Sequence, residues 1–288
     1  MLLATMGKGG AGKSVVTGTL ARVLARRGRR VLVLDSDPLP GITYSLGAQP
    51  PEEAPLTAAV EPGTNRRWKY VDGVGAVRAV QRYATDAPDG VRVLQIPKTS
   101  RENVAQQDAA VNAFYMTVQR LQRAEAFREW VILGDLPAGA RQIALGWAPY
   151  AEHVLLVVEP TWQSMLTARR IARVAALAEP SPRVSLVVSK ATGEGDERAV
   201  SDVLRLPVLE VVPADEDVRE AERAGVAVLD YAPECAAVRA IERLADRLEA
   251  AHGPRAMPKG AAPPTPCGCG APPRERRRSS RPASPAGR

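Results

Sequence analysis

Residues 7–14 read Gly-Lys-Gly-Gly-Ala-Gly-Lys-Ser, and this stretch is the strongest indication of the fold in the chain. A short apolar run, Leu2–Thr5, comes before it, and a helical pattern over Ser14–Arg27 follows it. Glycines let a backbone wrap closely around a phosphate with successive N–H groups pointing inward, and the N-terminus of a helix attracts anions. The stretch therefore predicts a phosphate-binding loop between a strand and a helix.

The same residues match the P-loop pattern G-x-x-x-x-G-K-[S/T]. In such a loop we expect Lys13 to bridge the β- and γ-phosphates of a nucleotide and the Ser14 hydroxyl to ligate Mg²⁺. A glycine-rich turn without a ligand is disfavoured, because the lysine, the serine and the strand–helix context occur together. The expected nucleotide contacts come from the loop and the residue after it: Gly7, Lys8, Gly9, Gly10, Ala11, Gly12, Lys13, Ser14 and Val15.

Apolar runs of strand length alternate with helical patterns along the rest of the chain. Val31–Leu34, Val131–Leu133 and Val154–Val158 are apolar on both faces, as strands of a helix-covered parallel sheet are. We predict an α/β fold with a doubly wound, mostly parallel sheet and helices on both faces. The other predicted strands are Val91–Ile96, Val184–Val188 and Val208–Val212, and the other predicted helices are Ala105–Arg128, Gln163–Ala178, Asp215–Ala224 and Glu234–Ala251.

Two segments depart from this alternation. Gln49–Asp89 contains five prolines, and we predict that it is an insertion over one end of the sheet, with Trp68–Val71 and Val77–Tyr83 as short elements. Residues 253–288 carry nine of the 25 prolines and almost no large apolar side chains, so this tail cannot build a core. We therefore predict one folded domain over residues 1–252 and a disordered tail over 253–288.

Composition excludes several classes of protein. The tail holds eight basic residues and one acidic residue, so it accounts for the whole net charge of +7. The neutral body, residues 1–252, gives no general reason to expect nucleic-acid binding. The longest apolar run, Val154–Val158, is far shorter than the roughly 20 residues of a membrane span. Three cysteines cannot form a disulfide framework, and the N-terminus does not resemble a signal peptide, so we expect a cytoplasmic protein.

Two of the predicted strands end in acidic residues. Asp35-Ser36-Asp37-Pro38 follows the strand Val31–Leu34, and Gly134-Asp135-Leu136-Pro137-Ala138-Gly139 follows the strand Val131–Leu133. Carboxylates at the carboxyl ends of parallel strands face the ligand crevice of an open sheet. A turn or a helix cap would explain one aspartate of the first segment but explains both of them less easily.

With Lys8 directly after its first glycine, the loop resembles the deviant Walker A motif of the ParA/MinD superfamily, K-G-G-x-G-K-[S/T]. The resemblance implies ATP and Mg²⁺ as ligands and a homodimer in which Lys8 reaches the nucleotide of the other subunit, where a cation neutralises developing charge. The alternative for Lys8 is a solvated loop lysine. The resemblance also implies that Asp37 orients the attacking water, which makes Lys8, Lys13 and Asp37 the expected catalytic residues. The implied magnesium site comprises Ser14, Asp35 and, through a water molecule, Asp135.

Base recognition is expected from two further segments. The stretch Val211–Asp215 is similar to the loop that frames adenine in these ATPases, which implies that Pro213 and Asp215 contact the nucleotide. Lys190 stands where relatives often carry Asn-Lys, with Ser189 in place of the asparagine, and a plain surface lysine is the alternative. We expect ATP rather than GTP because the guanine-reading motif N-K-x-D is absent.

Within the superfamily, the chain is most similar to the CooC-type ATPases, which mature carbon monoxide dehydrogenase, and to the nitrogenase iron protein. This resemblance implies a slow switch ATPase that acts on a protein client, with a metalloenzyme as the candidate client and the insertion 49–89 as its candidate binding surface. The cysteine sites of those relatives are not carried over, because residues 91–134 contain no cysteine and the only Cys-x-Cys, Cys267–Cys269, lies in the tail. Two alternatives stay open: a ParA/MinD-type positioning or partition ATPase that binds DNA or a membrane surface, and a nucleotide-sensing regulator.

Overall fold

The structure is a computed structural model that describes residues 1–37, 41–49, 51, 55–63, 68–96, 104–121, 123–146 and 148–252. Three sequence predictions therefore lie outside the described residues. They concern Pro38, the disordered tail 253–288, and the cysteine pair Cys267 and Cys269 within that tail.

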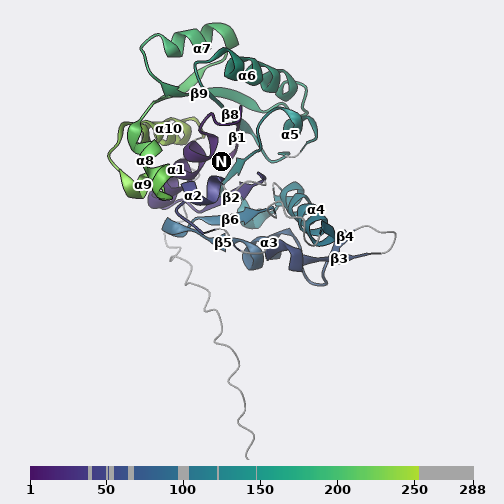
Figure 1. The fold of residues 1–288 in the computed structure, drawn as a ribbon. Coiled ribbons are helices and arrows are strands. Elements are labelled where there is room, and N and C mark those ends of the chain that lie inside the picture. The colour runs from purple at the N-terminus through teal and green to yellow at the C-terminus, as the bar shows by residue number, and fades with distance from the viewer. Residues whose placement is uncertain are drawn as a thin grey trace, which may run out of the picture. The chain divides into compact units, whose positions relative to one another are not determined.

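An eight-stranded sheet forms the centre of the fold, in the order β10-β9-β8-β1-β7-β2-β6-β5 (Figure 1). All neighbouring strands are parallel except β5 and β6, which pair antiparallel. The predicted mostly parallel, doubly wound sheet is confirmed. The strands are β1 (Leu2–Gly7), β2 (Val31–Asp35), β5 (Thr85–Asp86), β6 (Arg92–Gln95), β7 (Val131–Asp135), β8 (His153–Val158), β9 (Arg183–Ala191) and β10 (Val208–Pro213).

Helices cover both faces of this sheet, because side chains that alternate along each strand point to opposite faces. In β1, for example, Leu3 belongs to one apolar cluster and Met6 to the cluster on the opposite face. The first face is covered by α1 (Lys13–Arg26), α2 (Gly41–Ser45), α8 (Glu216–Ala224), α9 (Val228–Tyr231) and α10 (Ala236–His252). The opposite face is covered by α3 (Ala76–Tyr83), α4 (Val104–Leu121), α5 (Arg141–Ala144), α6 (Trp162–Ala175) and α7 (Asp196–Leu204).

The described part of the insertion 49–89 contains more regular structure than the sequence suggested. A 3₁₀ helix over Pro55–Ala59 leads into an antiparallel hairpin of β3 (Val60–Pro62) and β4 (Trp68–Tyr70), and α3 follows. These elements share an apolar cluster with α4 and with β2 and β6 of the sheet. The insertion ends in β5, a two-residue edge strand that no sequence pattern predicted because it is too short to show a period.

An ionic cluster around the buried Arg22 ties the end of the insertion to the core. The guanidinium of Arg22, on α1, donates hydrogen bonds to Asp89 Oδ2 at 2.6 Å and to Asp230 Oδ1 at 2.8 Å. Hydrogen bonds and charge from both aspartates outweigh the burial of Arg22, and its pKa is raised. The cluster joins α1, the turn before β6 and α9, which are far apart in the sequence.

Among the described residues, no helix has the length and hydropathy needed to cross a membrane.

The two histidines of the chain lie together at the end of the sheet away from the phosphate-binding loop. His153, the first residue of β8, is buried, and its Nδ1 lies 3.3 Å from Nε2 of His252 at the end of α10. Its Nε2 lies 2.9 Å from Ser185 Oγ. Burial lowers the pKa of His153 to about 4, and the charges of His252 and Arg183 act in the same direction. The uncharged imidazole is therefore the form that the fold accommodates.

This burial predicts a specific loss of stability in acid. An unfolded histidine titrates near pH 6.5, so between that value and about 4 the unfolded chain binds more protons at position 153 than the folded chain. The stability that results from the lowered pKa of His153 is fully present above pH 6.5 and is lost as the pH falls towards about 4. On going from pH 7 to pH 5, we expect the free energy of unfolding of the wild type to fall by about 2 kcal/mol more than that of His153→Gln. Urea unfolding at both pH values measures this, and parallel losses in the two proteins would contradict it.

Candidate nucleotide-binding site

The phosphate-binding loop runs from the end of β1 to the start of α1, as predicted. Gly12, the residue before α1, has φ 87°, a left-handed conformation that glycine adopts without strain. At Gly7 the constraint is one of space, because a Cβ atom there would lie 2.3 Å from the carbonyl oxygen of Val157 on β8. The loop can therefore leave β1 in this direction only if position 7 has no side chain.

The two loop lysines have different surroundings. Lys13 is buried, and its Nζ donates a hydrogen bond of 3.2 Å to the main-chain oxygen of Lys8, so its ammonium lies over its own loop. The Lys8 side chain is partly exposed, and its ammonium makes no hydrogen bond or ion pair with any residue that the structure describes. Lys13 is thus placed for a ligand inside the loop, whereas Lys8 is available to a group outside it.

The acidic residues predicted from the strand ends come together beside this loop. Asp35 and Asp135 end the neighbouring strands β2 and β7 and lie opposite each other in the register. Ser14 Oγ, at the start of α1, donates a hydrogen bond of 2.7 Å to Asp135 Oδ2. The backbone N–H of Asp37 donates to Asp35 Oδ1 at 3.1 Å. One point in the fold therefore holds the loop serine and the carboxylates of both segments.

Asp135 carries the most unusual electrostatics of the site. It is almost fully buried, and this burial raises the pKa of its carboxyl to about 7. The charges of Asp35 and Asp37 act in the same direction, whereas the hydrogen bond from Ser14 and the charge of Lys13 oppose them. Its second oxygen, Oδ1, is buried and accepts no hydrogen bond from the described residues.

The side-chain oxygen atoms of Ser14, Asp35 and Asp135 fit the ligand preference of a magnesium ion. Mg²⁺ prefers carboxylate and hydroxyl oxygens and usually keeps several of its waters, and a cation favours the ionised form of a buried carboxyl. The buried Oδ1 of Asp135 is an acceptor that the described protein groups leave unused, and Ser14 Oγ lies next to the same carboxylate. Ser14 and Asp135 are therefore the residues best placed to hold the ion, with Asp35 beside them.

A cavity of about 730 Å³ opens beside the loop. Its volume lies within the range usual for sites that bind small molecules and cofactors. The predicted nucleotide-binding residues that line it are Gly10, Gly12, Lys13, Ser14, Val15, Lys190, Pro213 and Asp215. The others, Gly7, Lys8, Gly9 and Ala11, belong to the loop but not to the cavity wall.

One wall of the cavity was missed by the sequence analysis. It is formed by Val218, Arg219 and Glu222 of α8, and further lining residues are Thr192 and, from α2, Gly41 and Ser45. Positions 215, 218, 219 and 222 share one face of a helix by their spacing. Because the helix begins directly after the Pro213–Asp215 loop, this spacing could have predicted the wall.

Two of the residues predicted to contact the base already have protein partners. Lys190 Nζ donates to the main-chain oxygen of Gly10 at 2.6 Å and to Glu159 Oε1 at 2.8 Å. The carboxylate of Asp215 accepts from the backbone N–H of Asp217 at 3.1 Å and of Ala237 at 2.9 Å. Burial alone would raise the pKa of Asp215, but its hydrogen bonds outweigh burial and the pKa is lowered. In this structure Lys190 supports the loop, and Asp215 joins the starts of α8 and α10.

Comparison with known proteins agrees with this geometry. Residues 2–228 match the family described as the CobQ/CobB/MinD/ParA nucleotide binding domain. The chain belongs to this family. The predicted ParA/MinD relationship and the nucleotide-binding domain are therefore confirmed.

Relatives and solved structures of the family place the chain further. An uncharacterized ATP-binding protein of Methanocaldococcus jannaschii is 26% identical over 233 residues, which cover 78% of this chain and 90% of that protein. The carbon monoxide dehydrogenase accessory protein CooC of Rhodospirillum rubrum is 24% identical over 251 residues, covering 82% and 92%. The cell division ATPase MinD of Pyrococcus furiosus superposes with a TM-score of 0.64 at 24% identity, covering 86% of this chain and 98% of that one. MinD of Pyrococcus horikoshii in complex with Mg-ADP gives 0.65 at 21% identity, covering 87% and 96%. The predicted fold and the similarity to CooC-type proteins are confirmed.

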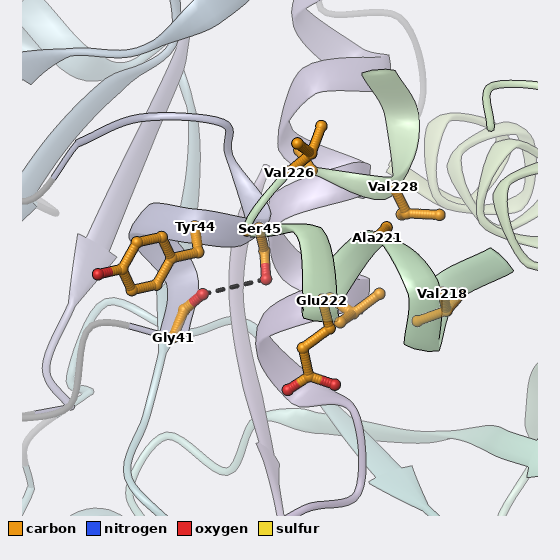
Figure 2. A pocket seen from close by; sticks show the side chains of 11 residues that line it. Gly41, Tyr44, Ser45, Val218, Ala221, Glu222, Val226 and Val228 are labelled. Carbon is orange, nitrogen blue, oxygen red and sulfur yellow. Dashed lines mark hydrogen bonds between the residues drawn. The ribbon is translucent and has the colours of Figure 1, made fainter. Parts of the chain in front are cut away.

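A second, smaller pocket of about 400 Å³ adjoins the nucleotide cavity in this member of the family (Figure 2). It lies between α2 on one side and α8 and α9 on the other, and Val15, Ser45 and Glu222 line both hollows. Ser45 Oγ donates to the main-chain oxygen of Gly41 at 3.0 Å, so its hydroxyl is turned onto its own helix (Figure 2). The remaining lining is mostly apolar, with Tyr44 and Val226 among the exposed residues.

The close approach at Gly7 predicts an effect of Gly7→Ala. The added methyl group would overlap the Val157 oxygen, so β1 and β8 must separate or the loop must move. We expect the free energy of unfolding to fall by about 1–3 kcal/mol, the usual cost of overpacking a core. Gly9→Ala is the matched control, because its Cβ would meet only Ala138 Cβ, at an ordinary 3.8 Å. Urea unfolding compares the stability of Gly7→Ala and Gly9→Ala. Equal stability of the two variants would contradict the lack of space at position 7.

Proposed function

We propose that this chain binds ATP with Mg²⁺, hydrolyses it slowly and works as a dimeric switch ATPase on a protein client. The observation that carries the proposal is the 2.7 Å hydrogen bond from Ser14 Oγ to Asp135 Oδ2, beside the buried Lys13 and the 730 Å³ cavity. It brings a phosphate-binding loop and a cation-binding carboxylate to one place. The family supports a nucleotide, and the similar MinD structure was solved with Mg-ADP.

Each site residue has a role that its position suggests. The backbone N–H groups of the loop and the Lys13 ammonium bind the phosphates, and Ser14 and Asp135 hold Mg²⁺. The ion, when bound, neutralises phosphate charge and aligns the phosphate oxygens. Asp37 follows the end of β2, next to the strand that carries Asp135. From there its carboxylate orients the attacking water.

Two substitutions separate binding from turnover. Lys13→Ala removes the buried cation of the loop and should abolish ATP binding. Asp37→Ala should leave ATP affinity unchanged and slow hydrolysis about 100-fold or more, because it removes water positioning but no phosphate contact. Calorimetry measures binding, and phosphate release measures turnover. Asp202→Ala, an exposed aspartate on α7, is the matched control and should behave as the wild type. Equal turnover by Asp37→Ala and the control would refute the role of Asp37.

The dimeric part of the proposal rests on Lys8. Its ammonium has no partner among the described residues of its own chain, and Lys13 already serves the loop from within. Across a dimer interface that contains both loops, Lys8 would meet the phosphates of the other subunit and supply charge there.

The dimer should therefore depend on nucleotide and on Lys8. With Asp37→Ala as the background, ATP should shift the mass seen by light scattering from monomer to dimer. Adding Lys8→Ala should weaken that shift, since it removes the cation that crosses the interface. Lys69→Ala, an exposed lysine on β4, serves as the control and should leave the shift intact. A monomer at high concentration under every nucleotide condition would refute the dimer.

The proposed client is a metalloenzyme. The similarity to CooC, which is named as an accessory protein of carbon monoxide dehydrogenase, supports this class of client. The neutral charge of residues 1–252 gives the body little attraction for DNA, which disfavours the partition alternative. The switch would couple client binding to the nucleotide through the segments after β2 and β7 that hold Asp37 and Asp135.

A further inference from the structure

The outward face of α6 exposes large apolar side chains. Trp162, its first residue, is 60% exposed, and Leu166, one turn later, is 43% exposed. Leu145, directly after the neighbouring helix α5, is 52% exposed. An exposed tryptophan one turn from an exposed leucine, with a further exposed leucine at the end of the helix that packs on α6, is the kind of apolar surface that marks an interaction site.

Arginines continue the same face of the helix. Residues 162, 166, 169 and 173 share one side of a helix by their spacing, and Arg169 and Arg173 are exposed. Within the part of the chain that the structure describes, neither arginine makes an ion pair. By contrast, Arg22 on α1 and Arg27 directly after α1 pair with acidic side chains. Two guanidinium groups on this face are thus available to an external carboxylate.

This face is not needed to hold the fold together. Helix α6 packs against β1, β8, α5 and α7 through its other side, where Met165, Ala168 and Ile171 are buried. Trp162, Leu145 and Leu166 are only partly covered by this packing, and Arg169 and Arg173 are exposed. Their exposed parts add little to the packing of the core, which indicates an external role.

The exposed face is also connected to the nucleotide site. Helix α5 begins just after Gly139, whose N–H donates to the main-chain oxygen of Gly7 at 3.1 Å. Helix α6 begins just after Glu159, which accepts from Lys190, and Lys190 in turn holds the loop at Gly10. The two helices lie next to each other in Figure 1 and pack together. Movement of the loop or of the segment after Asp135 would therefore reach this face directly.

The described side chains of the insertion at 49–89 offer no comparable surface. Among its residues whose side chains the structure describes, no large apolar one is exposed. Its apolar residues pack instead against α4 and the sheet. We therefore move the client site, which the sequence analysis placed on the insertion, to the α5–α6 face.

We propose that the α5–α6 face, made of Leu145, Trp162, Leu166, Arg169 and Arg173, docks the client, and that the docking segment is an acidic amphipathic helix. The inference rests on the proposed switch function, for which it names the contact surface and the partner chemistry. Tryptophan and arginine are the usual anchors of protein interfaces. Apolar side chains on the segment would cover Trp162 and Leu166, and its carboxylates would pair with the two arginines.

Two other occupants fit less well. A symmetric contact with a second copy would set one end of this face against the opposite end of the copy's face, so the arginines would meet Trp162 and Leu166 and find no carboxylate there. A membrane-surface helix presents a continuous apolar face to lipid. Here the continuous apolar face of α6 is buried in the core, and the exposed stripe has Arg169 and Arg173 directly after its apolar end.

The test uses the full chain and two labelled helical peptides, one built of leucine and glutamate at amphipathic spacing and one with lysine in place of glutamate. Fluorescence anisotropy should show binding of the acidic peptide only. The double variant Arg169→Glu/Arg173→Glu should weaken that binding about tenfold or more and should gain binding of the basic peptide. Trp162→Ala/Leu166→Ala should weaken binding of the acidic peptide without reversing the preference. Arg239→Glu, the same change at an exposed arginine on α10, is the control and should match the wild type.

Three results would overturn the proposal. One is acidic-peptide binding that is absent, or that the double variant leaves unchanged. Another is sedimentation with phosphatidylserine vesicles that the wild type shows and the same variants lose, which would assign the face to lipid. The third is loss of the ATP-dependent dimer in Trp162→Ala/Leu166→Ala, which would assign it to a second copy. Circular dichroism confirms that each variant folds.

The failure of this surface can be told from failure of the proposed function. ATP turnover is measured on the same variants, and none of the substituted residues lies in the loop or the acidic cluster. If the wild type hydrolyses ATP but does not bind the acidic peptide, only the docking face is refuted. Absence of turnover in the wild type refutes the ATPase whatever the peptides do.

Discussion

The hydrogen bond between Ser14 and Asp135 is the contact on which the site depends. It joins the first turn of α1 to the end of β7, so the phosphate-binding loop and the acidic strand ends share one rigid frame. The register of β2 on β7 places Asp35 beside Asp135. Burial then leaves the carboxyl of Asp135 with a raised pKa and an unused oxygen, which is a good environment for a divalent cation and a poor one for a bare charge.

The position of β1 in the sheet explains why so many parts converge. It lies between β7 and β8, and the loop leaves its carboxyl end, where ligands bind in open α/β sheets. Close contact with β8 leaves no room for a side chain at Gly7. The segment after β7 is held to the loop through Gly139, and the ends of β8 and β9 are held through Glu159 and Lys190. One strand thus connects the loop with both flanks of the sheet.

These connections lead outward to the α5–α6 face, whereas the opposite end of the sheet has a different character. There His153 and His252 close the base of β8 against the last turn of α10, and the fold requires an uncharged imidazole. The loop end carries buried charged groups, among them an Asp135 oxygen that no described group satisfies, whereas at the other end the buried His153 has both ring nitrogens near partners. We expect conformational change at the first end and global stability to respond to acid at the second.

The loop, the parallel sheet and the two acidic strand ends could be predicted from the sequence, because glycine spacing, apolar runs and motif chemistry are local properties. The sequence also predicted that Asp35 and Asp135 lie together near Ser14, since the carboxyl ends of parallel strands meet at one edge of the sheet. Only the tertiary structure decided that Asp215 caps two helices, that Lys190 supports the loop and that two distant histidines touch. It also showed that α6 exposes an apolar and basic face, whereas the described side chains of the insertion include no exposed large apolar residue. These features depend on which side of each element packs against residues far away in the chain, and no local pattern encodes that choice.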